Sequence, residues 1–194
     1  ETFTKIVAYY LLHPKGTAQS ILNRLKEPNK VPNLVFPESF MPCYTLLAYC
    51  LMSNHFHFML RQEDGNLTIS DFMRRLSITY AMYFNHKHHH SGAIFQGKYK
   101  NVLITNEYQW LYLSKYIHRN PLHLRKNKVP NLALYLCSSY QNYLGKRTDR
   151  WINTSQILDR HVHDPVGIYQ RFVEEGTDTK KNEKLTLDAD ELQK

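Results

Sequence analysis

The sequence has few cysteines, and their number and spacing are not those of a disulfide-stabilised or zinc-stabilised protein. Its 194 residues contain three cysteines, Cys43, Cys50 and Cys137. An odd number without a CxxC spacing argues against a disulfide framework and against a thiolate zinc site. Chains with so little cysteine are typical of a reducing compartment, so we expect a cytoplasmic protein.

Long apolar runs are also missing. No window approaches the roughly 18 consecutive apolar residues of a membrane-spanning helix. With 42% hydrophobic, 22% charged and 13% aromatic residues, the chain can build an ordinary core and is neither collagen-like nor a low-complexity disordered protein. We expect one main domain over residues 1–173 and a polar, flexible tail over residues 174–194.

Acidic residues are scarce in the middle of the chain. The net charge is +8, yet the stretch from Arg74 to Arg150 contains 13 Lys and Arg and only two acids, a net +11, whereas residues 174–194 carry −3. This density predicts a polyanionic partner, because each phosphate that is neutralised releases counterions. The same stretch holds nine of the 14 tyrosines, on which bases can stack. A solvated basic surface with tyrosines in the core is the alternative.

Hydrophobic spacing and turn residues predict a mixed α+β fold. Residues 44–51 and 55–60 are short, aromatic-rich runs separated by Met52-Ser53-Asn54, which predicts a β-hairpin. Residues 98–104 alternate and predict a further strand. A helix over 107–119 is expected to start at a Thr105 or Asn106 cap and to end before Pro121. Other helices are expected over residues 3–12, 18–26 and 69–86, and within 138–143, 151–158 and 165–174.

Two histidines, His55 and His57, lie at the start of the second predicted strand. Side chains at i and i+2 point to the same face of a strand, so both imidazoles project together while Phe56 and Phe58 enter the opposite side. Adjacent imidazoles can ligate a divalent cation, although two ligands alone make a poor site, and a structural or surface role is the alternative. A second histidine cluster, His86 and His88–His90, is interpreted as part of a solvated loop.

The predicted helix over residues 107–119 carries a second polar group. Tyr116 and Asn120 are four residues apart and share a face if the last turn holds, together with Tyr108 and Tyr112. An aromatic stripe at this spacing is most often core, and an asparagine before proline is most often a cap, so simple packing is the alternative. His118 points about 200° away from Tyr116 on a helical wheel, and we assign it a structural role.

Four ordered segments, residues 47–60, 94–100, 116–121 and 138–143, resemble the REP-associated tyrosine transposases of bacteria. These are single-tyrosine HUH transposases, named for a histidine–hydrophobic–histidine signature that His55-Phe56-His57 matches. The resemblance spans about residues 44–145. It implies an α+β fold of the HUH type, in which a ferredoxin-like antiparallel sheet has helices on one face. The family opens with a strand ahead of its first helix, and we expect that strand to be missing upstream of residue 1.

The resemblance also implies roles for individual residues. Tyr116 is the expected nucleophile on a DNA phosphate, and His55, His57 and Asn120 are the expected ligands of Mg²⁺ or Mn²⁺. Tyr112 is the alternative nucleophile by position. Tyr116 is followed four residues later by the amide of Asn120, whereas Tyr112 is followed at this spacing by Tyr116 itself, which is neither an amide nor an acid. A phenol is almost neutral at pH 7, so the phosphate needs a metal ion to polarise it, whereas no nucleotide cofactor is required. Six basic residues are expected to hold phosphates: Arg74, Arg75, Lys98, Lys100, Lys115 and Arg119.

The four ordered motifs that carry the resemblance, together with the basic stretch from Arg74 to Arg150, predict a metal-dependent endonuclease and strand transferase. It is expected to form a 5′-phosphotyrosine intermediate on hairpin-containing single-stranded DNA. We expect the protein to act on DNA in the bacterial cytoplasm, away from membranes, as a monomer or as a homodimer that exchanges catalytic helices. Two alternatives stay open. One is a non-catalytic DNA- or RNA-binding module of the same fold, and the other is a metal-dependent nuclease that uses water and forms no covalent intermediate.

Overall fold

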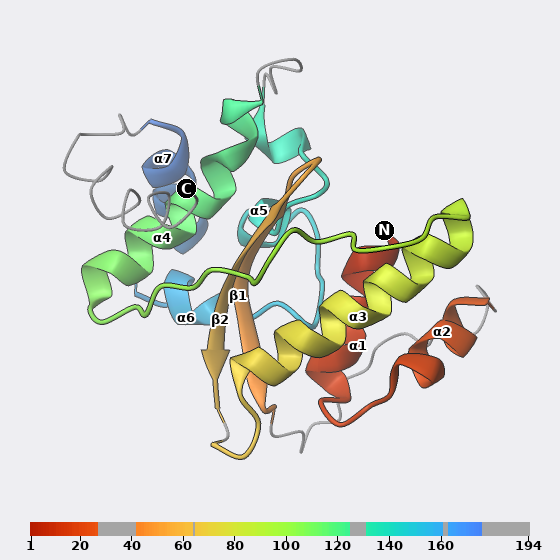
Figure 1. Cartoon of the computed structure of the whole chain (residues 1–194). Helices are drawn as coiled ribbons and strands as arrows, with labels where there is room; N and C mark the ends of the chain where they lie inside the picture. Colours follow the sequence, from red (N-terminus) through yellow and green to blue (C-terminus); the bar gives the residue numbers. More distant parts are fainter. Residues whose placement is uncertain (27–41, 64, 125–130, 161–162, 176–194) are drawn as a thin grey trace. The chain divides into compact units, whose positions relative to one another are not determined.

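The computed structural model describes residues 1–26, 42–63, 65–124, 131–160 and 163–175, which form a mixed α+β protein (Figure 1). Of the expected tail over residues 174–194, only Glu174 and Glu175 fall within these ranges, at the end of the last helix. Among the helices described, none is long and apolar enough to cross a membrane.

The predicted hairpin is confirmed as a two-stranded antiparallel sheet of β1 (Tyr44–Leu51) and β2 (Phe56–Gln62). All but the last residue of β1 are buried, in keeping with its continuous apolar and aromatic sequence. On the edge away from β2, β1 forms an antiparallel bridge between Cys50 and Ser138 and a parallel bridge between Leu46 and Ile152. β1 therefore has backbone partners on both edges and is an interior strand.

The chain divides into two compact units, and the first comprises Glu1–Thr45 and Arg61–Tyr99. Three helices pack together in it: α1 (Thr2–Leu12), α2 (Ala18–Lys26) and α3 (Ile69–His88). A capping box of Thr68 and Asp71 starts α3, which runs two residues beyond the predicted end. His86 and His88 therefore lie in its last turn rather than in a loop, but they are exposed, as are His89 and His90.

The second unit comprises Leu46–Leu60 and Lys100–Lys194. Its elements are α4 (Glu107–Arg119), the 3₁₀ turns η2 (Asn120–His123) and η3 (Leu132–Leu134), α5 (Tyr140–Tyr143), α6 (Ser155–Leu158) and α7 (Pro165–Glu174). The Asn106 side chain accepts a hydrogen bond from the Gln109 amide and starts α4, as predicted. Helices α4 and α7 lie side by side (Figure 1). Apolar side chains from β1, β2, α4, α5 and α7 share one core, among them Leu47, Met59, Ile117, Tyr143 and Tyr169.

The strand predicted over residues 98–104 is wrong. This segment, part of the connection between α3 and α4, has no regular secondary structure. Val102, Leu103 and Ile104 are consecutive apolar residues, so a strand here could not bury one face and expose the other. Leu103 is 79% exposed, and in the described ranges no other strand pairs with this segment. A strand needs such a ladder of backbone hydrogen bonds, which explains the irregular conformation.

Candidate active site

The histidine pair has the arrangement that the sequence predicts. The His55 and His57 rings lie with their centroids 5.0 Å apart and their planes almost perpendicular. The Phe56 and Phe58 rings likewise contact each other, with 4.7 Å between centroids. His55 is held by a 2.7 Å hydrogen bond between its Nδ1 and Oδ1 of Asn54 in the turn. The alternation of side chains from His55 into β2 thus gathers two imidazoles on one side of the chain and two phenyl rings on the other.

Helix α4 brings Tyr116 against this pair. The Tyr116 ring centroid is 5.6 Å from that of His57, and the rings meet edge to face at 83°. Tyr116 is half-buried, so its ring is held by the fold while part of it still reaches solvent. The hairpin histidine and the helix tyrosine, 59 positions apart in the sequence, therefore belong to one site.

Asn120 lies at the C-terminal cap of α4 and is 4% exposed. Its Nδ2 donates a 3.0 Å hydrogen bond to the carbonyl oxygen of Tyr116, and its backbone amide bonds the same oxygen, so the last turn of α4 is formed. Because this bond uses the donor end of the amide, Oδ1 is the end that can accept or ligate. Nitrogen from two imidazoles and oxygen from one amide form a donor set that suits a divalent cation. Within the described part of the chain, no three His, Cys, Asp or Glu residues converge as a metal site.

Tyr112, the rival nucleophile, is engaged with other partners. Its ring lies 4.1 Å from that of Tyr108 and 5.2 Å from that of Phe172, centroid to centroid. A side-chain hydrogen bond with Tyr108, which favours the protonated phenol, is the largest cause that raises the pKa of Tyr112 above its ordinary value. A phenol with a raised pKa is harder to deprotonate, so this environment disfavours Tyr112 as the attacking group.

Three of the six basic residues expected to hold phosphates present their charge to solvent. Lys98 and Lys100 are exposed in the irregular connection, and Arg74 is exposed on α3 beside Asp71. Arg74 and Lys98 belong to the first unit and Lys100 to the second. Lys98 and Lys100 are therefore available to an external anion, whereas Arg74 also has Asp71 as an ion-pair partner at 3.4 Å.

The other three basic residues make contacts inside their own unit. Arg75 donates to the carbonyl oxygen of Gly16 at 2.9 Å, and Arg119 donates to that of Val173 at 2.7 Å. Lys115 is 5% exposed, and its Nζ lies 4.8 Å from the centre of the Phe172 ring, a cation–π contact. These side chains serve the packing of α3 and α4, which a count of charges along the sequence does not reveal.

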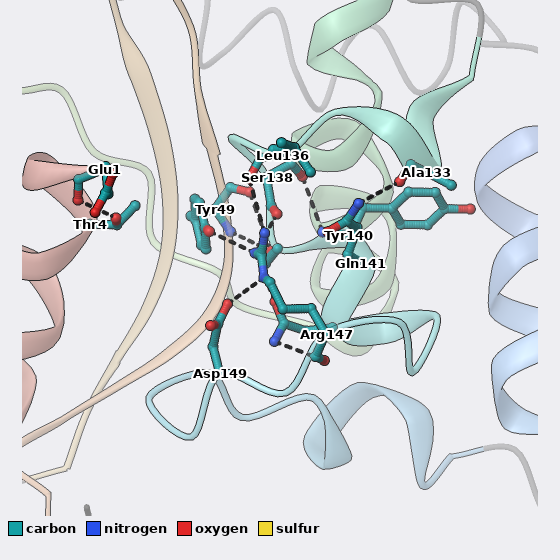
Figure 2. Close-up of polar contacts among 12 residues, drawn as sticks. Glu1, Thr4, Tyr49, Ala133, Leu136, Ser138, Tyr140, Gln141, Arg147 and Asp149 are labelled. Atoms are coloured by element: carbon teal, nitrogen blue, oxygen red, sulfur yellow. Dashed lines mark hydrogen bonds and ion pairs between the residues drawn. The ribbon is translucent and has the colours of Figure 1, made fainter. Parts of the chain in front are cut away.

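Arg147 has a structural role that is not predicted from the sequence, where it is one of the 13 Lys and Arg residues between Arg74 and Arg150. Figure 2 shows this guanidinium between β1 and the segment that follows η3. It donates to Oη of Tyr49 and to the carbonyl oxygen of Ser138, at 2.8 and 2.7 Å, and forms an ion pair with Asp149 at 2.5 Å. Arg147 therefore fixes the motif at residues 138–143 against β1. The Arg-x-Asp spacing of residues 147–149 is the one local signal of this role.

Residues 42–120 match the family model described as "Transposase IS200 like". The match covers the hairpin, the histidine pair, Tyr116 and Asn120, and it ends before the motif at residues 138–143. No curated protein and no solved structure gives a significant match to the chain.

Proposed function

Because the chain carries an IS200-like transposase domain over residues 42–120, the family to which the REP-associated tyrosine transposases belong, we propose that it cleaves and rejoins single-stranded DNA through Tyr116. A domain of this family implies a transposase-type DNA nuclease. The finer proposal concerns the mechanism: a divalent metal, a covalent 5′-phosphotyrosine and a hairpin-containing substrate.

The observation that carries this proposal is the contact between Tyr116 and His57, with 5.6 Å between ring centroids. A nucleophile and the groups that bind the reacting phosphate must be held together before the reaction, because orientation supplies much of the rate enhancement. Tyr116 comes from a helix and His57 from a strand of the same unit, and Tyr116 packs against the core of that unit.

The proposed chemistry is a transesterification. Oη of Tyr116 forms a bond to the scissile phosphorus and gives up its proton, the bond from phosphorus to the 3′-oxygen breaks, and the departing 3′-oxygen takes up a proton. The phosphodiester energy is kept in the phosphotyrosine, so a 3′-hydroxyl can later reverse the step and join a new strand. His55, His57 and Oδ1 of Asn120 would hold Mg²⁺ or Mn²⁺, which when bound polarises the non-bridging phosphate oxygens.

In this proposal the hairpin of β1 and β2 is the centre of a ferredoxin-like antiparallel sheet of the HUH type. The two bridges on the far edge of β1 support it, because they make β1 an interior strand.

The exposed cations Arg74, Lys98 and Lys100 are the first candidates for phosphate contacts, which give affinity but little sequence choice.

The test is the formation of a covalent adduct. The protein is incubated with single-stranded hairpin DNA and Mg²⁺ or Mn²⁺, and protein–DNA species that resist denaturant are quantified by gel. We expect wild type to form the adduct, Tyr116→Phe to form none, and Tyr112→Phe, the matched control on the same helix, to behave like wild type. Adduct with Tyr116→Phe at equal yield would overturn the assignment.

The same assay separates the two alternatives. Cleaved DNA without trapped protein would indicate a nuclease that uses water. Salt-dependent binding without cleavage would indicate a non-catalytic binding module.

A further inference from the structure

A chain of buried hydrogen bonds connects β1 to α4, the helix that carries Tyr116. It starts at the backbone amide of Tyr49, which donates to Oγ of Ser139 at 2.8 Å. It ends at Oγ of Ser114, which donates to the carbonyl oxygen of Leu111 at 2.7 Å. We call its four side chains the buried relay, and each is 0% exposed: Ser139, His118, Tyr169 and Ser114.

The direction of each hydrogen bond in the buried relay follows from counting protons. Ser114 uses its single hydroxyl proton on Leu111, so at its 3.0 Å contact with Tyr169 it accepts, and Tyr169 donates. The phenolic proton of Tyr169 is then used. At the 2.8 Å contact between Tyr169 and Nδ1 of His118, the tyrosine accepts, so Nδ1 carries a proton.

The same count of protons determines whether Nε2, the other ring nitrogen of His118, carries a proton. The two ring nitrogens of His118 contact two hydroxyls rather than an acid, and a charged imidazolium buried among hydroxyls and tyrosine rings would be costly. A neutral ring with its proton on Nδ1 has a bare Nε2, which accepts from Oγ of Ser139 at 2.8 Å. Ser139 has a second possible acceptor in the Tyr49 carbonyl oxygen, but that contact is longer, at 3.3 Å. Every group in the buried relay thus has a partner in one consistent direction.

The relay contacts α4 at two residues, Ser114 and His118, which lie on either side of Tyr116 in the sequence. Ser114 and His118 are four residues apart and buried on the same side of the helix. Tyr116 lies two residues from each, which places it about 200° around the helix, toward His57. Two anchors one turn apart resist both sliding of the helix along its axis and rotation about it.

The opposite end of the relay is tied to the strand that pairs with the histidine strand. Ser139 bonds the backbone of Tyr49 in both directions, since its own amide donates to the Tyr49 carbonyl oxygen at 3.0 Å. β1 in turn pairs with β2, and the Met52 amide donates to the carbonyl oxygen of His55 at 2.8 Å. The relay therefore links the backbone that carries His57 to the helix that carries Tyr116.

We propose that the buried relay is a positioning device for the nucleophile, in which His118, as the neutral Nδ1–H tautomer, sets the axial and rotational position of α4 so that Tyr116 meets His57. His118 and its partners are positioning residues rather than catalytic ones, because they touch neither the site face nor a reacting atom. The consequence for rate rests on the proposed function; the tautomer and the ring contact do not.

The test compares two buried tyrosines, each changed to phenylalanine. Tyr169→Phe breaks the buried relay. Tyr143→Phe is the matched control: Tyr143 is also 0% exposed, stacks on Tyr169 at 4.7 Å between centroids and donates one hydrogen bond, to the Leu47 carbonyl oxygen at 2.8 Å, outside the relay. Both variants remove a buried phenolic hydroxyl, and we expect thermal stability to fall in both, more in Tyr169→Phe because its hydroxyl makes two hydrogen bonds and that of Tyr143 makes one.

The readouts then separate positioning from stability. In the adduct assay, the single-turnover rate of Tyr169→Phe should fall about ten- to a hundredfold while DNA affinity is unchanged, since a small misplacement of a reacting group costs this much. Tyr143→Phe should keep the wild-type rate. Equal rates in the two variants would overturn the positioning role.

Two measurements by NMR do not depend on activity. In wild type at pH 7, ¹⁵N-labelled histidine should show His118, assigned by comparison with His118→Gln, as the Nδ1–H tautomer; the Nε2–H tautomer or a charged ring would overturn the relay. The nuclear Overhauser effect between the Tyr116 and His57 rings should be present in wild type and Tyr143→Phe and absent in Tyr169→Phe. If wild type forms no DNA adduct, the proposed function fails, while these two measurements still decide the inference. If the adduct forms and the Overhauser effect survives in Tyr169→Phe, the inference alone fails.

Discussion

The Tyr116 ring meets the His57 ring edge to face, with 5.6 Å between their centroids. This contact joins the strand of the histidine pair to the helix of the expected nucleophile inside one compact unit. His55 adds a second imidazole 5.0 Å from the first, and Asn120 reaches back to the carbonyl oxygen of Tyr116. The four polar residues predicted to act together are thus connected by direct contacts, and each contact leads to a test.

Replacing the imidazoles should remove metal binding without removing the fold. We expect His57→Gln and His55→Gln to weaken Mn²⁺ binding, measured by titration calorimetry, by more than about tenfold, because two ligands of the proposed set are nitrogen donors. Chelation of the metal with EDTA should likewise abolish adduct formation by wild type. His90→Gln is the control, since His90 is exposed on the first unit and its Nδ1 lies 2.9 Å from Oδ1 of Asn85. Unchanged Mn²⁺ affinity in both site variants would contradict the ligand assignment.

Asn120 should tolerate one substitution and not another. In Asn120→Ala the Tyr116 carbonyl oxygen loses its amide donor and the site loses an oxygen ligand, so we expect adduct formation to fail and the free energy of unfolding to drop by about 1 kcal/mol. Asn120→Gln keeps both the donor and the acceptor and should retain part of the activity. Urea unfolding and the adduct assay measure the two effects. Equal activity of the alanine and glutamine variants would argue against a role for Oδ1.

The features predicted correctly from the sequence are those determined by local spacing. The i and i+2 spacing of His55 and His57 is enough to place them on one face, and the Asn106 cap and Asn120-Pro121 define both ends of α4. What the sequence does not reveal depends on long-range contacts. Lys115 is covered by Phe172 and Arg147 is held by Tyr49, partners 57 and 98 positions away in the sequence. Nothing in the sequence around Lys115 separates it from a cation that binds DNA, and for Arg147 the one local signal is the Arg-x-Asp spacing of residues 147–149.

The salt dependence of DNA affinity distinguishes an exposed cation that contacts phosphate from a cation buried inside the protein. We expect the double variant Lys98→Gln, Lys100→Gln to weaken binding of single-stranded DNA and to reduce the slope of log affinity against log salt by up to about 1.4, or about 0.7 for each phosphate that is no longer neutralised. Lys115→Met, which replaces a buried cation by an apolar side chain of similar length, should leave this slope unchanged and alter only stability. Fluorescence anisotropy at salt concentrations from about 50 to 200 mM covers the needed range. A smaller slope in Lys115→Met than in the double variant would place the DNA contact on α4 instead.

His118 should make the stability of the protein sensitive to acid. Complete burial lowers its pKa to about 3, whereas an imidazole in the unfolded chain titrates near 6.5. Below about pH 6.5 the unfolded chain therefore binds a proton that the folded protein excludes, and the free energy of unfolding should fall by roughly 1 kcal/mol per pH unit as the pH decreases toward about 3, with no contribution from this residue above about pH 7. Urea unfolding of wild type from about pH 7.5 to 4.5 measures this slope.

In His118→Gln the slope should be smaller over the same range even though the variant is less stable at neutral pH, because glutamine loses hydrogen bonds but has no proton to gain. His90→Gln, with its exposed ring, should keep the wild-type slope. Equal slopes in wild type and His118→Gln would mean that the folded protein accommodates a charged imidazole at this position, in conflict with a ring enclosed by the hydroxyls of Tyr169 and Ser139.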